Sequence, residues 1–128
     1  MRGLWAATAI TTTGCVPIDG GAVELRWTIH NLVADERHEE GERIDCDEAG
    51  ISTLSLLVDP GSRDGPAYPF DCDDGRGSSD FDIAPGRHLF SIAPAGPRAD
   101  QATVPDPISA QVREGEVTDL QVLLIRVP

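Results

Sequence analysis

Lysine is absent from this chain of 128 residues, so all ten basic residues are arginines, and they are outnumbered by 22 acidic residues. The formal net charge of -12 disfavours nucleic acid as a partner, because phosphate binding needs clustered cations. It also disfavours electrostatic docking on anionic membrane surfaces. The simplest interpretation of this acidity is that it keeps an exported protein soluble.

Aromatic residues and methionine are also scarce, with two Trp, three Phe, one Tyr and one Met. Aliphatic side chains must therefore fill most of the core, and a chain of this length can form one ordinary domain. The hydrophobic content of 40% argues against disorder over the whole chain. The early apolar run, Leu4 to Ile10, is far too short to span a bilayer.

Recognisable catalytic motifs are missing as well. We find no nucleophile elbow, P-loop, dinucleotide fingerprint or metalloprotease helix. His38 is followed by two glutamates, but it lacks the second histidine of a zinc-binding helix, so a solvated loop is the simpler interpretation. His88 is predicted to be a hydrogen-bonded structural histidine near the core. The sequence therefore predicts a protein that is not an enzyme.

Alternating apolar and polar residues predict strands along most of the chain. The clearest is 22–30, in which Trp27 shares the core face with its aliphatic neighbours; a ligand-stacking role for Trp27 is the alternative. Further strands are expected at 51–58, at 68–72, from Phe81 onward, and at 87–92, 108–112 and 117–127. For 51–58, a short helix is the alternative.

Turn residues separate these strands. Residues 31–45 are mostly charged and are expected to form an exposed loop. The prolines between 93 and 107 predict a long surface connection with an edge segment near Thr103. Glu114-Gly115-Glu116 carries a hairpin signal. In the last strand, apolar residues on both faces indicate a central strand or one with a covered outer face.

The N-terminal residues have the order of a secretory signal: Arg2, a short apolar run, then small residues up to Gly14-Cys15. Thr12-Thr13-Gly14-Cys15 resembles a bacterial lipoprotein lipobox, although that pattern prefers an aliphatic residue where Thr12 stands. The resemblance implies a signal peptide at 1–14, lipidation of Cys15, a tether at 15–21 and membrane attachment through the lipid. An N-terminal strand with an ordinary cysteine, or a cleaved signal without lipid, are the alternatives.

The same resemblance implies a location in the cell envelope. Val16 stands where an Asp would signal retention in the inner membrane, so an outer-membrane lipoprotein facing the periplasm or the surface is expected. Lipidation of Cys15 would leave Cys46 and Cys72 as an even pair. A disulfide between them, 26 residues apart in sequence, would persist outside the cytoplasm and add roughly 3–4 kcal/mol of stability. Two buried thiols are the alternative.

One acidic cluster could in principle bind a metal ion. Aspartates gather around two glycines in the segment 71–82, and carboxylate oxygens on such a loop suit calcium. The candidate ligands are Asp71, Asp73, Asp74 and Asp80. The remaining ligands of an EF-hand are missing, so a solvated acidic loop is the competing interpretation, and no other cofactor is expected.

The segment Ala84-Pro85-Gly86-Arg87-His88-Leu89-Phe90-Ser91-Ile92 and the later Gly115 to Val122 resemble small bacterial lipoproteins with a carboxypeptidase-regulatory-like or prealbumin-like domain. The resemblance covers residues 22–128. It implies an all-β fold, a single antiparallel β-sandwich of about seven strands with an Ig-like or prealbumin-like arrangement. That family has no shared catalytic residues. The expected function is a non-enzymatic, lipid-anchored module with a binding or structural role, whose loops face an envelope protein, a glycan or a small ligand. A calcium-stabilised adhesive or carbohydrate-binding sandwich is the alternative.

Overall fold

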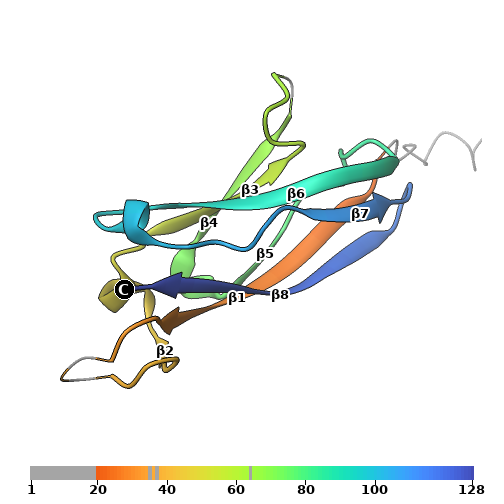
Figure 1. Ribbon diagram of the computed structural model, residues 1–128. Coiled ribbons are helices and arrows are strands. Elements are labelled where there is room, and N and C mark those ends of the chain that lie inside the picture. The colour runs from red at the N-terminus through yellow and green to blue at the C-terminus, as the bar shows by residue number, and fades with distance from the viewer. Residues whose placement is uncertain (1–19, 35, 37, 64) are drawn as a thin grey trace, which may run out of the picture.

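The computed structural model describes residues 20–34, 36, 38–63 and 65–128. Regular structure in these residues is almost entirely strand (Figure 1). The short helical elements are α2 (Cys46–Ala49) and the 3-10 turns η1 (Cys72–Asp74) and η2 (Ala99–Gln101). The strands are β1 (Ala22–Asn31), β2 (Arg43–Ile44), β3 (Thr53–Val58), β4 (Ala67–Asp71), β5 (Arg76–Ser78), β6 (Gly86–Ala95), β7 (Ile108–Val112) and β8 (Val117–Val127).

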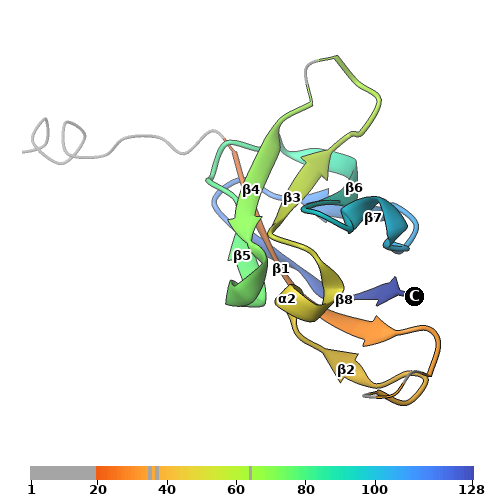
Figure 2. The ribbon, with the colours of Figure 1, turned by 90° about the vertical axis from the view of Figure 1, so that its left-hand side faces the viewer.

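The strands form two four-stranded sheets, which are seen from two directions in Figures 1 and 2. In the β1 sheet, β8 pairs along one edge of β1, while β2 and β5 share the other edge. In the β3 sheet, the order is β4-β3-β6-β7. The predicted all-β sandwich is thus confirmed.

One strand pair differs from the antiparallel prediction. β1 and β8, the first and last strands, run parallel from Ala22 opposite Val117 to Asn31 opposite Val127. The reason lies in the turn at 113–116, which was expected to close a hairpin. It instead carries the chain from β7 in one sheet to β8 in the other, so β8 finds β1 as its neighbour.

The alternation in β1 positions the core as predicted. Val23, Leu25, Trp27 and Ile29 are all 3% exposed or less, whereas Glu24 and Arg26 face solvent. The β3 sheet contributes its own inward side chains to the same cluster: Leu54, Leu56, Val58, Phe90 and Ile92.

The prediction that β8 is a central strand, or one with a covered outer face, is wrong. β8 pairs with β1 along one edge, and among the described residues only Thr103 bridges its other edge. Val122 and Leu124 are 50% and 36% exposed on its outer face.

A β-bulge interrupts the apolar pattern of this strand. Glu24 lies opposite Asp119 and Arg26 lies opposite Val122, so β8 has one extra residue in this interval. Gln121 has a φ of 71°, which is the left-handed region. Beyond it, Leu123, Ile125 and Val127 are buried, whereas Val122 is 50% exposed.

Two expectations about residues 73–83 are wrong. The polar segment Arg76–Ser78 forms β5 on the edge of β1, because backbone pairing needs no apolar side chain. Gly77 makes this possible, since a Cβ there would come within 2.6 Å of the Phe70 ring. Phe81 begins no strand; it is exposed, and nearby Ile83 makes only a single bridge with Gly21.

The proline-rich connection begins later than expected. β6 continues to Ala95 and includes Pro94, which lies opposite Leu54. This half of β6 lacks a strand on its other side, because β7 pairs only with the residues from Gly86 to Phe90. A proline is tolerated where its missing N–H faces an unpaired edge. The edge segment predicted near Thr103 is confirmed by its bridge to Arg126.

The chain enters the sandwich between two loops at one end, which we call the entry pole. Gly21 N–H donates to the Ile83 carbonyl oxygen, and Ala22 N–H donates to that of Glu116. Gly21 also packs so tightly that a Cβ would come within 2.3 Å of the Arg113 carbonyl oxygen. The C-terminus lies at the opposite end of the sandwich (Figure 1). No helix in the described part of the chain is long and apolar enough to cross a membrane.

Candidate functional site

The predicted disulfide is present. Cys46 and Cys72 are bonded, with their Cα atoms 6.0 Å apart, so they are not the two separate thiols of the alternative. The bridge joins α2, which precedes β3, to η1, which follows β4. Cys15, the predicted lipidation site, lies outside the described residues.

Local capping and Trp27 hold the disulfide in place. The Asp45 carboxylate accepts a hydrogen bond from the Glu48 N–H at 2.8 Å and caps α2. The Trp27 indole N–H donates to the Cys72 carbonyl oxygen at 2.9 Å, and its ring stacks on Phe70 with the ring centres 6.1 Å apart. The core position predicted for Trp27 is confirmed, and the bridge is part of the core that joins the sheets.

The four aspartates proposed for calcium are spread over three segments. Asp71 ends β4, Asp73 and Asp74 belong to η1, and Asp80 follows β5; all four are exposed. In the described ranges, no three His, Cys, Asp or Glu side chains form a group that could hold a metal ion. The calcium hypothesis therefore rests on the sequence alone.

His88 clamps β6 to two loops, which confirms the hydrogen-bonded position predicted for it. Its Nδ1 lies 2.7 Å from Asp59 Oδ2, and its Nε2 lies 2.6 Å from the Ala84 carbonyl oxygen. Both partners are acceptors, so a doubly protonated ring satisfies both. Burial lowers the pKa of His88, but the hydrogen bonds to Asp59 and Ala84 outweigh burial and raise it overall.

The same contact changes the pKa of Asp59. The hydrogen bond from His88, together with the Leu89 N–H at 3.0 Å, lowers the pKa of the Asp59 carboxyl group. Asp59 adopts a φ of 50°, which is uncommon for a residue other than glycine. The two hydrogen bonds therefore stabilise a tight turn directly after β3.

His38 is more ordered than the solvated loop that was expected. Its Nδ1 lies 2.7 Å from Glu42 Oε2, and its Nε2 contacts a carboxylate oxygen of Glu48 in α2. Hydrogen bonds to Glu48 and then to Glu42 raise the pKa of His38. This histidine thus connects the loop after β1 to the helical turn that begins with the disulfide.

Sequence reasoning missed a concentration of arginine on the outer face of the β1 sheet. Arg76 of β5 lies directly opposite Arg26 of β1. Further along β1, His30 lies between Arg126 of β8 and Arg43 of β2. We call Arg26, Arg43, Arg76 and Arg126 the arginine face. The alternation of β1 reveals that Arg26 points outward, but only the strand register shows which arginines are its neighbours.

This face reverses the charge balance of the whole protein. Two of the ten arginines, Arg2 and Arg37, lie outside the described residues, so the arginine face holds half of the other eight. All four are exposed. Arg26 lies 3.8 Å from Asp119. The other three have no ion-pair partner among the residues that the structure describes.

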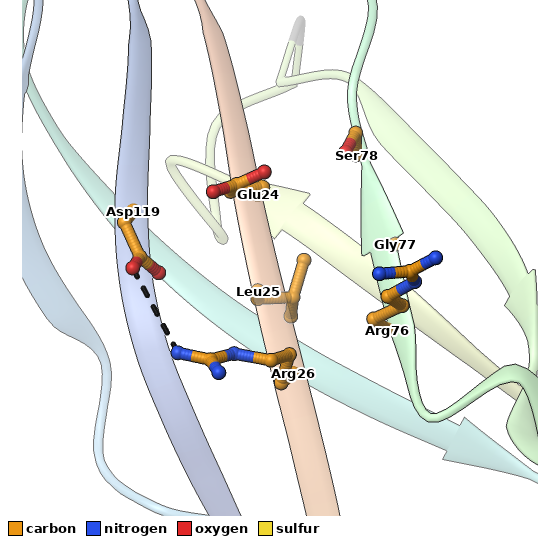
Figure 3. A pocket seen from close by; sticks show the side chains of 7 residues that line it. All are labelled: Glu24, Leu25, Arg26, Arg76, Gly77, Ser78 and Asp119. Atoms are coloured by element: carbon orange, nitrogen blue, oxygen red, sulfur yellow. Dashed lines mark ion pairs between the residues drawn. The ribbon is translucent and has the colours of Figure 1, made fainter.

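A shallow depression of about 590 Å³ crosses this face at Arg26 and Arg76. Figure 3 shows Arg26 reaching across β1 towards Asp119, while Arg76 lies on the other side, on β5. Ser78 and Glu24 border the depression towards the entry pole. The depression offers guanidinium donors beside a hydroxyl group, and these groups can bind anions and polar ligands.

Comparisons with known proteins do not assign this surface. No protein-family model matches the chain, and a search of curated proteins finds no match either. The chemistry of the side chains must therefore carry the functional argument.

Proposed function

We propose that this chain is a non-enzymatic, lipid-anchored protein of the cell envelope whose β-sandwich binds a ligand or partner. The observation that carries the proposal is Gly14-Cys15 at the end of a short apolar leader, shortly before β1 begins at Ala22. The Cys46–Cys72 disulfide supports it, because such bonds persist outside the cytoplasm. The proposed location is the outer membrane, facing the periplasm or the surface.

The entry pole suggests how an anchored protein would be oriented. A lipid on Cys15 would hold the domain by residues 15–21, which extend over at most about 25 Å. The entry pole would then face the membrane. The outer faces of both sheets and the pole that carries α2 would remain accessible to a partner.

The contacts of His38 and His88 are those of structural residues. His38 and His88 each direct both ring nitrogens at acceptor oxygens that hold loops in place. A general base needs a nitrogen that can accept a proton from a reacting group. The contacts of these two histidines instead favour the protonated ring.

The intact mass of the protein tests the anchor. The full chain is expressed in a Gram-negative host, extracted from membranes with detergent, and alkylated with and without prior reduction. We expect a mass that begins at Cys15 and includes acyl groups, with two thiols alkylated only after reduction. Cys15→Ala is the matched control and should not gain acyl mass. A wild-type mass that begins at Met1, with three thiols alkylated without reduction, would refute the proposal.

A further inference from the structure

We propose that the arginine face binds an anionic polysaccharide that carries carboxylate or sulfate groups along an extended chain. This inference rests on the proposed binding role and names a ligand class for it. The site itself consists only of residues in the β1 sheet, so its test does not depend on whether Cys15 is lipidated.

The first argument is that Arg26 and Arg76 lie directly opposite each other on neighbouring strands, and that of these two only Arg26 has an ion-pair partner among the residues that the structure describes. Like charges directly opposite each other on neighbouring strands destabilise a sheet. The exposed contact between Arg26 and Asp119, at 3.8 Å, is of a kind that contributes only about 0–1 kcal/mol. The Arg26 guanidinium points towards Asp119, away from Arg76 (Figure 3), so an anion over β1 would be held by both side chains once Arg26 leaves this weak contact. A guanidinium group donates two parallel hydrogen bonds to a carboxylate.

The second argument is the repetition of arginine pairs along the sheet. Arg26 and His30 are four residues apart, so the row of Arg26 and Arg76 lies about 13 Å from the row of Arg43 and Arg126. Thr28 and Leu124 lie opposite each other between the two rows and carry no charge. One small anion can reach only one row. An extended chain with repeated anionic groups can contact both rows.

The third argument is that the face carries hydroxyl groups and lacks an aromatic anchor, although Val122 and Leu124 are exposed beside Arg26 and Thr28. The hydroxyl groups of Ser78 and Thr28 lie beside the arginines and can bond to sugar hydroxyls. Among the outward-facing residues of β1, β2, β5 and β8 there is no aromatic side chain. Protein interfaces usually depend on buried aromatic anchors, so this face is a poorer match for a protein partner.

The acidity of the remaining protein also limits the choice of ligand. A net charge of -12 repels an anionic membrane surface, which would face a broad area of the protein. A thin polysaccharide can touch the arginine face without approaching most of the acidic residues. Glu24 and Asp119 lie opposite each other at the entry-pole end of the depression, and they mark where an anionic ligand would stop.

Binding of defined polysaccharides tests the proposal. Titration calorimetry on the detergent-extracted full chain would use polygalacturonate and dextran sulfate as anionic probes and neutral dextran as the uncharged control. The test variant is Arg26→Gln/Arg76→Gln. Its matched control, Arg63→Gln/Arg113→Gln, removes the same charge from exposed positions elsewhere. We expect the test variant to lose tenfold or more in affinity and the control less than twofold, with wild-type binding weakening as salt rises.

Several results would overturn the proposal: equal losses in both variants, no binding of either anionic probe by the wild type, or tighter binding of polyglutamate or of anionic phospholipid vesicles. Thermal melting checks the folding of each variant. Should Arg26→Gln/Arg76→Gln melt early, Arg43→Gln/Arg126→Gln tests the other row. Intact mass separates the two proposals, because a protein without lipid that still shows the arginine-specific loss would refute the anchor alone.

Discussion

At the scale of residues, three interactions hold the loops of the sandwich. The Cys46–Cys72 bridge joins α2 to η1, His38 joins the loop after β1 to α2, and His88 joins β6 to the turn after β3. The bridge does not titrate, whereas the two histidines do, and the pKa of each is raised above its ordinary value. The free energy of unfolding should therefore depend on pH, because the histidine contacts that hold the loops change with protonation.

His88 allows this dependence to be given a sign. Its folded-state pKa is raised, so its stabilising contribution is fully present below the ordinary histidine value of about 6.5 and is lost as the pH rises through the folded value. The pKa of Asp59 is lowered, so the contribution of Asp59 is lost only in acid, below about 3.9. We expect the urea midpoint of the wild type to fall as the pH rises above about 6.5.

The comparison with His88→Gln identifies the residue responsible. Glutamine cannot gain the positive charge, so the fall in the urea midpoint should be smaller in this variant. His38 has a pKa raised in the same direction, and the double variant with His38→Gln should show the smallest fall. An unchanged pH profile in His88→Gln would contradict this account of the clamp.

At the scale of elements, β8 is the strand whose observed pairing departs most from what its sequence pattern predicts. Its extra residue at Gln121 lets Leu120 and Leu123 both face the core, although they are three positions apart. A regular strand would place two such residues on opposite faces. The bulge thus places Leu120 on the same buried face as Leu123, whereas Val122 and Leu124 stay exposed on the outer face.

Deletion of Gln121 should therefore be tolerated. Without this residue, Leu25 can face Leu120 and Arg26 can face Val122 in unbroken register, and every inward side chain keeps its face. The deletion also removes the left-handed backbone at φ 71°. That conformation costs a non-glycine residue about 1–2 kcal/mol. We expect the thermal midpoint of the deletion variant to equal or exceed that of the wild type.

Deletion of Thr28 is the control, because β1 is regular at that point. It would turn the buried residues Ile29 and Asn31 to the opposite face, and a slip of one residue reverses every later side chain. We expect this variant to be unfolded by circular dichroism. Loss of folding on deletion of Gln121 as well would show that the bulge is required for folding.

At the scale of the whole molecule, charge repulsion opposes the compact state. The 22 acidic residues outnumber the ten arginines, and half of the arginines in the described residues lie on one sheet face. Salt screens interactions between exposed charges over about 10 Å at 0.1 M. Added salt should therefore act in opposite directions on folding and on the proposed binding of an anionic polysaccharide.

Thermal melting over a range of NaCl concentrations checks this prediction. Raising the salt from about 10 to about 500 mM shortens the screening length from about 30 Å to about 4 Å, and this should raise the melting temperature of the wild type by several degrees. The same change should weaken binding to polygalacturonate. A melting temperature that falls with salt would mean that attractive ion pairs outweigh the repulsion.

Much of the fold follows from neighbouring residues in the sequence. The alternation of Val23 to Ile29 determined one face of β1, because successive side chains of a strand point to opposite sides. Asp59-Pro60-Gly61 indicated the end of β3 through turn chemistry. The cysteine count, together with the lipobox resemblance, pointed to the Cys46–Cys72 pair. Each of these inferences depends on local geometry or on residue types that can be counted.

The tertiary structure alone decided which strands are neighbours and in what register. The parallel pairing of β1 with β8 joins the two ends of the described chain, and β5 pairs with β1 although its polar residues show no strand pattern. The arginine face depends on both pairings, since its members come from four strands. Such contacts arise from the packing of distant segments around a common core, and no local sequence pattern encodes them.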